Sequence, residues 1–276
     1  MLARLTSIIA IVVLITTSCG DHLMTTRTPE PTVAPTPKPT ALSLADLIKS
    51  GKLRAAFNQL NIACVQTNAR GEAGLCVEIA AELATQLHTT LITSTYNNGA
   101  VLMDAGRAGD WDVAFVSLDF NIPQPGMNAT AAYLEIEQTY LVPGDSPYNS
   151  VADLDRQGVR IASFSPSAIE VFLKQNLKYA TVIDVPSIAH AVTLIEQHEA
   201  EAYAGSRDEV DDGGWRLAGG RVLSDSITRF RWGVVIASGR SDLFAYVTQF
   251  LETAKRSGFI QDAIETTKVS GARVAP

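Results

Sequence analysis

From residue 42 onwards, short apolar segments alternate with segments in which apolar residues recur every three or four positions. The first pattern is typical of strands and the second of amphipathic helices. The expected strands are 53–57, 90–96, 111–116, 133–142, 159–164, 181–185, 202–205 and 230–237. The expected helices are 77–87, 100–107, 167–176, 187–199, 242–256 and 260–267, with Gly258 as the glycine that ends the fifth. This alternation predicts an α/β fold with mostly parallel sheets flanked by helices.

The alternation occurs in two blocks, so we expect two lobes, each with its own sheet. The turn-forming residues 143–147 end the first block, and the strand near 229–232 is placed to return the chain to the first lobe. The predicted first lobe is 42–143 plus 233–276, and the predicted second lobe is 144–232. Two crossings of this kind predict a two-strand hinge. Ligands of such folds bind in the cleft at the carboxyl ends of the strands.

The N-terminal 41 residues have a different character. Arg4 precedes an apolar run at 8–15, which as a helix spans about 12 Å, against the roughly 30 Å of a membrane core. We therefore interpret residues 1–18 as a secretory signal peptide. The sequence Thr16-Thr17-Ser18-Cys19 resembles a bacterial lipobox, with Thr16 where leucine is usual. It predicts a membrane anchor through lipidated Cys19. The alternative is an ordinary cleaved signal peptide followed by a chance cysteine.

Residues 19–41 predict a tether. Five prolines between positions 29 and 39 alternate mainly with threonine. Such a segment cannot build a core and extends at about 3.1 Å per residue, so it holds a domain as much as about 60 Å from the anchor. With Cys19 assigned to the lipid, Cys64 and Cys76 remain in an exported chain, and we predict a disulfide between them. The alternative is two buried free thiols.

Composition excludes several classes of function. Lys and Arg number 22 against 29 Asp and Glu, a net charge of −7 without a basic cluster, which argues against nucleic-acid binding. Histidines and cysteines are scattered, so we expect no metal site and no cofactor. The chain also has no Gly-x-Ser-x-Gly elbow and no Walker loop, and we do not expect an enzyme.

Several stretches resemble the extracellular solute-binding proteins of family 3, the periplasmic or lipid-anchored receptors of polar amino-acid ABC importers. They are 47–54, 74–80, 109–115, 133–142 and 153–162, and the likeness covers about residues 42–270. The resemblance implies a two-lobed periplasmic-binding-protein-like fold of type II. It implies an extracytoplasmic, monomeric receptor that captures a small polar solute and delivers it to an ABC permease and ATPase. A sensory ligand-binding subunit and a cyclohexadienyl-dehydratase-like enzyme on the same fold are the alternatives.

The sequence departs from this family where the ligand is recognised. The family has an arginine after the Gly-x-x-Asp strand that binds the α-carboxylate, but here no arginine lies between Arg107 and Arg156. The family's aspartate for the α-amino group has Ser206 near its position, with Asp208 two residues on. A guanidinium fork has no neutral equivalent. The expected ligand is therefore another small polar molecule, unless binding has been lost.

The candidate ligand-binding residues follow strands or begin helices. They are Asn58, Asn61, Ser117, Asp119, Ser165, Ser167, Ser206 and Asp208. Either Ser167 caps the helix, in a capping box with Glu170, or Ser165 caps it with Pro166 in the first turn. Both arrangements place a helix N-terminus at the expected cleft, where it favours an anion. Capping alone explains these serines equally well, and the asparagines are equally typical of turns.

Overall fold

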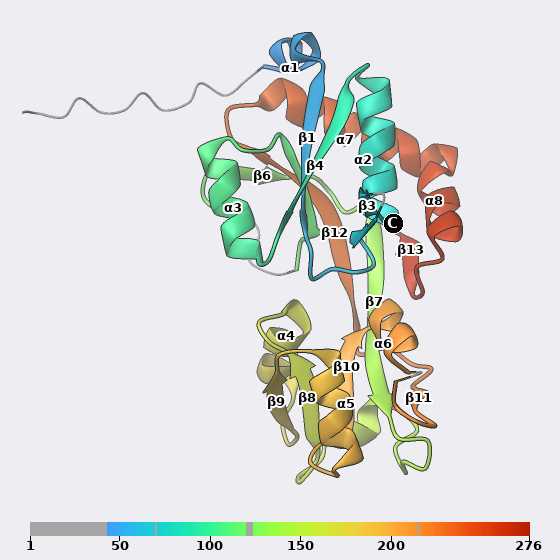
Figure 1. The fold of residues 1–276 in the computed structure, drawn as a ribbon. Coiled ribbons are helices and arrows are strands. Elements are labelled where there is room, and N and C mark those ends of the chain that lie inside the picture. The colour runs from blue at the N-terminus through green and yellow to red at the C-terminus, as the bar shows by residue number, and fades with distance from the viewer. Residues whose placement is uncertain (1–42, 70, 120–123, 215) are drawn as a thin grey trace, which may run out of the picture. The chain divides into compact units, whose positions relative to one another are not determined.

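The computed structural model describes residues 43–69, 71–119, 124–214 and 216–276 (Figure 1). The predicted signal peptide, Cys19 and the proline-rich tether lie outside the described residues.

Among the described residues, eleven strands form one continuous sheet. Its main path runs β4 (Thr90–Tyr96), β1 (Lys52–Asn58), β5 (Val113–Ser117), β12 (Thr228–Ala237), β7 (Leu134–Val142), β10 (Ala202–Ser206), β8 (Arg160–Phe164) and β9 (Thr181–Val185). Three short strands lie off this path: β6 (Met127–Ala129) pairs with β12, and β11 (Arg221–Val222) and β13 (Ala272–Val274) pair with β7. β1 is parallel to β4 and β5, and β8 is parallel to β9 and β10. β2 (Gln66–Asn68) and β3 (Gly71–Ala73) form a separate antiparallel pair.

The first lobe surrounds β4, β1 and β5. Phe57 and Phe115 point to one face of the sheet and pack in a core cluster with α2 (Leu75–Gln86), α7 (Ser241–Ser257) and α8 (Phe259–Thr267). Ala56 and Ala114 point to the other face and pack with Leu102 of α3 (Gly99–Ala108). α1 (Leu44–Ser50) precedes β1. Successive side chains of a strand alternate between its faces, so these nearly continuous apolar strands are buried on both sides.

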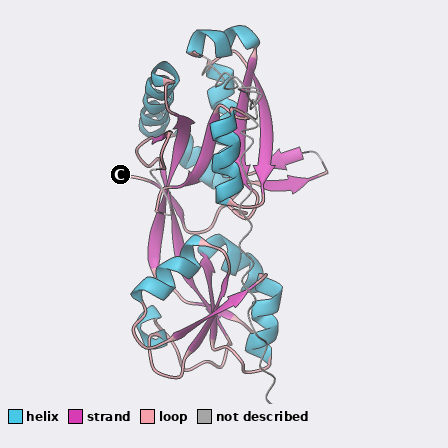
Figure 2. Cartoon of the chain, turned by 90° about the vertical axis from the view of Figure 1, so that its left-hand side faces the viewer, coloured by secondary structure: helices cyan, strands magenta, loops and turns pink. Residues whose placement is uncertain are grey.

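The second lobe repeats this construction around β10, β8 and β9. Ile161 and Ala204 pack with α4 (Ala168–Asn176), whereas Ala162 and Tyr203 pack with α5 (Ile188–Glu196) and the start of α6 (Arg207–Gly214). Figure 2 shows helices on both sides of these strands. A 3-10 turn (Val151–Leu154) leads into the lobe. The chain thus has the two-lobed α/β fold of periplasmic binding proteins.

β7 and β12 form the two-strand hinge, and both run from one lobe into the other (Figure 1). On β7, Ile136 belongs to the core of the first lobe and Tyr140 to that of the second. On β12, Phe230 belongs to the second core and Trp232 to the first. Each hinge strand therefore contributes side chains to the cores of both lobes. The lobe boundaries at 143/144 and 232/233 stay predictions.

All the helices and strands expected from periodicity are present, with ends that differ by a few residues. The helix expected at 187–199 stops at Glu196, because the chain reverses through His198 at a positive φ of 57°. Gly258 ends α7 in the left-handed conformation, as predicted. The elements that periodicity did not predict are short: α1, β2, β3, β6, the 3-10 turn, α6, β11 and β13.

Cys64 and Cys76 are bonded to each other, with their Cα atoms 4.7 Å apart. Cys76 lies in the first turn of α2, and Cys64 lies in the loop that follows β1. The disulfide therefore attaches this loop to the body of the first lobe.

Removing the disulfide is expected to destabilise the protein. In the entropic account a closed loop of this length contributes about 3 kcal/mol. Reductant should therefore lower the urea midpoint of the wild-type protein. Cys64→Ala combined with Cys76→Ala should unfold at a lower midpoint and show no effect of reductant. An unchanged wild-type midpoint, with both thiols found free by non-reducing peptide mapping, would contradict the bond.

Glu137, on β7, accepts hydrogen bonds from both Arg207 of α6 and Arg229 of β12. Its side chain is 15% exposed. Burial acts to raise the pKa of Glu137, but the hydrogen bond and charge of Arg207, together with Arg229, outweigh it and the pKa lies below its usual value. The ionised carboxylate therefore stabilises the folded protein at neutral pH and loses this effect as the pH falls through its folded pKa.

Glu137→Gln is expected to destabilise the fold by about 2 kcal/mol at pH 7, because it leaves two guanidinium groups without their anion. The loss should be smaller at pH 3, which lies below the usual glutamate pKa of 4.5, because protonation there favours the unfolded chain over the ion-paired carboxylate. Urea unfolding at both pH values measures it. Glu252→Gln, which removes a more exposed partner of Lys255, is the control and should change stability by less than about 0.5 kcal/mol. An equal loss at pH 3 and pH 7 would show that the ion pairs are not its cause.

Candidate functional site

A cavity of about 450 Å³ is lined by residues of both lobes and of the hinge. The first lobe contributes the loop after β1, the start of α3 and the end of β5. The second lobe contributes the start of α4, β10 and α6. Gln138 and Trp232 of the hinge strands lie among the lining residues. The cavity therefore lies where the two lobes meet, at the carboxyl ends of several strands.

Five of the residues expected from the sequence line this cavity: Asn58, Asn61, Ser117, Ser167 and Ser206. They come from segments up to 148 positions apart and from both lobes. All five carry neutral amide or hydroxyl groups, which donate and accept hydrogen bonds.

Asp119 and Ser165 are not among the lining residues. The carboxylate of Asp119 forms an ion pair with Arg231 at 2.6 Å and accepts the Arg231 backbone N–H. The backbone N–H of Ser165 donates to the carbonyl of Val185 on the neighbouring strand. Both residues are thus engaged with neighbouring strands.

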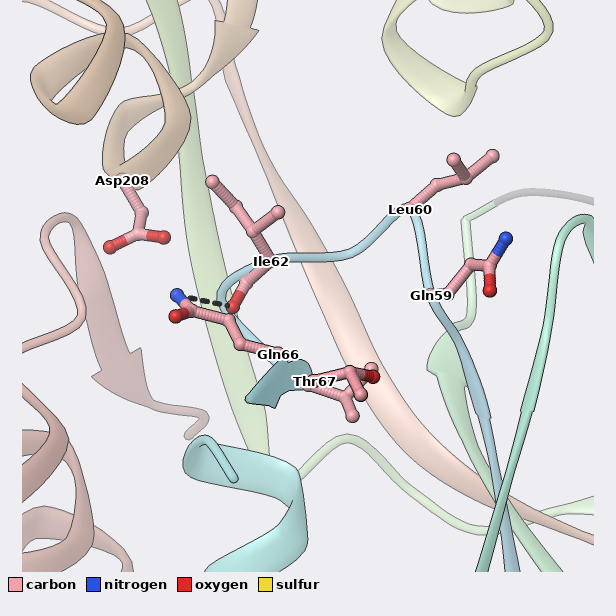
Figure 3. A pocket seen from close by; sticks show the side chains of 7 residues that line it. Gln59, Leu60, Ile62, Gln66, Thr67 and Asp208 are labelled. Carbon is pink, nitrogen blue, oxygen red and sulfur yellow. Dashed lines mark hydrogen bonds between the residues drawn. The ribbon is translucent and has the colours of Figure 1, made fainter. Parts of the chain in front are cut away.

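Asp208 lines a second, open groove of about 580 Å³, shown in Figure 3. Opposite it lies the segment after β1, where the Gln66 amide donates to the carbonyl of Ile62 at 3.2 Å. Asp208 Oδ1 accepts the backbone N–H of Ser270 at 3.3 Å. One helical step of about 100° separates Asp208 from Glu209, so the two carboxyls face different hollows.

Two helices begin at the cavity, one from each lobe. Ser167 is the N-cap of α4 and accepts the Glu170 N–H at 3.2 Å. Asn98 is the N-cap of α3 and accepts the Val101 N–H at 2.8 Å. Ser167, and not Ser165, therefore caps the helix, while the Glu170 carboxylate pairs with Lys174. The first turns of both helices bring partial positive charge to the cavity wall.

Ser117 and Trp232 face each other across β5 and β12. Directly opposed side chains of an antiparallel pair lie on the same face of the sheet. Both Ser117 Oγ and Trp232 Nε1 are buried and have no hydrogen-bond partner among the described residues. The indole of Trp111, by contrast, donates to the carbonyl of Leu102 at 2.8 Å. Buried donors without a partner cost about 1–3 kcal/mol each, so a polar group that reached this pair would gain hydrogen bonds that the described residues do not supply.

Glu209 is a lining residue that the sequence analysis missed. Its Oε1 accepts the hydroxyl of buried Tyr203 at 2.8 Å, and its backbone N–H donates to Ser206 Oγ. A Cβ at Gly205 would lie 2.6 Å from Glu209 Oε2, so this glycine leaves room for the carboxyl group. Burial raises the pKa of Glu209 to about 7. The helix that begins at Arg207 places Ser206 and Glu209 on one face. The sequence of this short helix has no apolar repeat that predicts it.

Among the described lining residues, Glu209 is the one charged side chain. The others include four aromatic residues: Phe164, Tyr203, Phe230 and Trp232. Burial raises the pKa of Tyr203 well above its ordinary value, so the phenol remains a neutral donor at physiological pH. The cavity thus combines one titratable acid with neutral polar groups and aromatic walls.

No protein-family profile matches the sequence, and no curated protein matches it either. Solved structures do share the fold. The ancestral amino acid-binding protein AncCDT-1, a precursor of cyclohexadienyl dehydratase, matches at 19% identity with a TM-score of 0.65, over 81% of this chain and 97% of that one.

Two further structures are similar to the same extent. The amino acid ABC transporter substrate-binding protein AbpA from Streptococcus pneumoniae, bound to L-arginine, matches at 19% identity with a TM-score of 0.64, over 82% of this chain and 99% of that one. A histidine kinase sensor domain similar to periplasmic binding proteins matches at 16% identity with a TM-score of 0.64, over 81% and 98%. At these identities the matches establish the fold.

Two further properties concern the described residues. None of their helices is both long and apolar enough to cross a membrane. Their histidine, cysteine, aspartate and glutamate side chains form no group of three able to hold a metal ion.

The raised pKa of Glu209 predicts a pH-dependent stability. The folded protein holds this proton up to about pH 7, whereas the unfolded chain releases it near pH 4.3. Stability is therefore expected to fall by up to about 3 kcal/mol between pH 4.5 and pH 8 through this group. Glu209→Gln should lack this component. Urea unfolding across that range measures it for the wild type and the variant.

Glu265→Gln, on the exposed face of α8, provides the matched control and should follow the wild-type pH curve. If the Glu209→Gln curve also ran parallel to the wild type at every pH, Glu209 would have an ordinary pKa in the folded protein.

Proposed function

We propose that this protein is an extracytoplasmic solute-binding lipoprotein that captures a small, polar, amino-acid-like solute between its lobes and delivers it to an ABC importer. The observation that carries the proposal is the cavity at the hinge. Its walls come from both lobes, and two of its lining residues, Ser117 and Trp232, carry buried polar groups that have no partner among the described residues. A solute that bonds to both walls favours the closed arrangement of the lobes and so shifts the population towards it.

The proposed ligand contacts are the neutral groups of Asn58, Asn61, Ser117, Ser167 and Ser206, together with Glu209 and Trp232. Capture of this kind needs no covalent chemistry. Its output is the closed form itself, which a membrane partner recognises. The permease and ATPase of an ABC importer are the proposed partners, and the proposed active form is a monomer held near the membrane by lipid on Cys19 and the tether at 19–41.

The structural neighbours support this reading and two others. AbpA is described as an ABC transporter substrate-binding protein, whereas another neighbour is a kinase sensor domain. A sensory subunit would use the same cavity and closure with a different partner. The enzyme alternative rests on Glu209, because a carboxyl with a pKa of about 7 is suited to proton transfer at neutral pH. AncCDT-1, a dehydratase precursor with this fold, makes that alternative concrete.

The proposal is tested by thermal unfolding of the protein with a panel of amino acids, opines, amines and small acids. At least one solute is expected to raise the midpoint with saturation, since a ligand at a hundred times its Kd adds about 2.7 kcal/mol. Ser117→Ala should weaken binding of that ligand roughly tenfold, while the ligand-free protein keeps its stability, because the hydroxyl has no hydrogen-bond partner among the described residues. Ser257→Ala, in the last turn of α7, should leave binding unchanged.

Absence of saturable stabilisation by every member of the panel would overturn the proposal. Stimulation of a reconstituted permease and ATPase by the loaded protein would identify import, and stimulation of a kinase would identify sensing. Aromatisation of prephenate by the wild-type protein, and loss of that activity in Glu209→Gln, would identify the protein as a dehydratase instead of a receptor.

A further inference from the structure

We propose that the solute is an organic cation without a carboxylate, such as an amino alcohol, whose ammonium group lies against Glu209 and the aromatic wall of the cavity. This inference rests on the proposed function and names the chemical class that the same site selects.

The charges at the cavity are the first reason. Glu209 is the one charged side chain among the described lining residues. Residues 120–123, which precede Gln124 in the sequence, carry no charged side chain. Two arginines beside the cavity, among those the structure describes, are already paired: Arg107, which reaches Gln124, with Asp104 at 2.6 Å, and Arg231 with Asp119. A zwitterion would therefore add a second carboxylate beside Glu209, whereas a cation would leave the pair neutral. Buried charges are tolerated when they are paired.

The aromatic residues that line the same cavity as Glu209 are the second reason. Phe164, Tyr203, Phe230 and Trp232 line the cavity with it, and Tyr203 is hydrogen-bonded to the carboxyl group. The faces of aromatic rings attract ammonium groups, most strongly where water is excluded. The same rings provide apolar contact for the carbon skeleton of the ligand. A carboxylate gains nothing from these faces.

The unpartnered donors are the third reason, and they define the other end of the ligand. Trp232 Nε1 donates only, so it requires an acceptor, and Ser117 Oγ lies opposite it. The starts of α3 and α4 also favour a partial negative charge. A hydroxyl or carbonyl oxygen satisfies these groups without adding a full charge. Together with the ammonium site, they indicate an amine that also carries a neutral oxygen.

Binding of a cation by Glu209 requires its ionised form. The titratable groups that act on it are Tyr203 of β10, which donates to it, and Asp208 of α6, whose negative charge opposes its ionisation. Of the charged groups on the other strands packed against α6, Glu137 of β7 is held by Arg207 and Arg229, and Arg221 of β11 donates to the carbonyls of Ser146 and Tyr148. Since burial raises the pKa of Glu209 to about 7, affinity for a cation of fixed charge should rise with pH on the order of 30-fold between pH 5.5 and pH 8.

The test compares compounds that share one side chain and differ only in their charged groups. One trio is L-phenylalaninol, L-phenylalanine and 3-phenylpropionate, and another is L-leucinol, L-leucine and 4-methylpentanoate. Choline provides a hydroxylated cation whose charge does not change with pH. Affinities are measured by calorimetry and by thermal shift at pH 5.5, 7 and 8. An amino alcohol or choline is expected to bind at least tenfold more tightly than the matched amino acid, and the acids should not bind.

Two variants locate the effect. Glu209→Gln keeps an oxygen that accepts from Tyr203 and should lose cation binding at least tenfold, together with the pH dependence. Glu265→Gln removes the same charge from the exposed face of α8 and should bind as the wild type does. Thermal unfolding without ligand establishes that both variants are folded.

Each other outcome overturns the inference. If an amino acid binds as tightly as its amino alcohol, or if cation binding survives Glu209→Gln with its pH dependence, the ligand class is wrong and the receptor proposal stands. If the amino alcohols, choline and the amino acids all fail to bind while an opine or a small acid of the larger panel saturates, the inference again fails alone. If nothing in that larger panel binds, the receptor proposal fails with it.

Discussion

The pairing of β7 with β12 is the interaction on which the rest of this structure depends. These two strands carry the chain between the lobes, and they are joined from Leu134 with Trp232 to Gln138 with Thr228. Beside this pairing, Glu137 accepts from Arg229 of β12 and from Arg207 of α6. Gln138 and Trp232 then line the cavity from the same strands. The hinge strands therefore also form part of the cavity wall. A change in the orientation of the lobes would alter the volume of the cavity that a ligand would occupy.

Periodicity predicted the strands and helices because each lobe is a sheet covered on both faces. Strands such as 111–116 are nearly all apolar for that reason, and α2 repeats its buried residues at Ile79, Leu83 and Ala84. The elements that were not predicted are those whose buried residues form no repeat in the sequence. α6 reads Arg-Asp-Glu-Val-Asp-Asp-Gly-Gly, in which the apolar residue Val210 gives no repeat. Its position follows from the tertiary structure, where Arg207 reaches Glu137 from 70 residues away.

Candidate residues were predictable where the end of a strand determines their place. They were unpredictable where an ion pair with a residue far away in the sequence determines it. Asn58, Ser117 and Ser206 end strands, so parallel topology was sufficient to place them at the cavity. Asp119 also follows a strand, but Arg231 captures it across 112 positions of sequence. No local pattern predicts that pairing.

Glu209 was missed for a different reason. Position after β10 indicated Asp208, but one residue on a helix changes the side of the helix that a carboxyl group faces. The sequence did indicate that the guanidinium expected for a carboxylate was missing. It did not indicate that the remaining charge at the cavity was an acid.

The absence of an arginine between Arg107 and Arg156 and the presence of Glu209 at the cavity fit together on electrostatic grounds. A cavity in which one carboxyl group is the charged side chain among the described lining residues favours a cation over an anion. In the ligand-free protein Glu209 avoids the cost of burial by holding a proton up to about pH 7. A cation placed beside it would lower that pKa, so below about pH 7 the binding of a cation is coupled to release of the proton. Glu209 shares the first turn of α6 with Arg207 and Asp208, and these contact β7 of the hinge and Ser270 respectively. One turn of one helix thus contains both the acid of the cavity and an arginine that is hydrogen-bonded to a hinge strand.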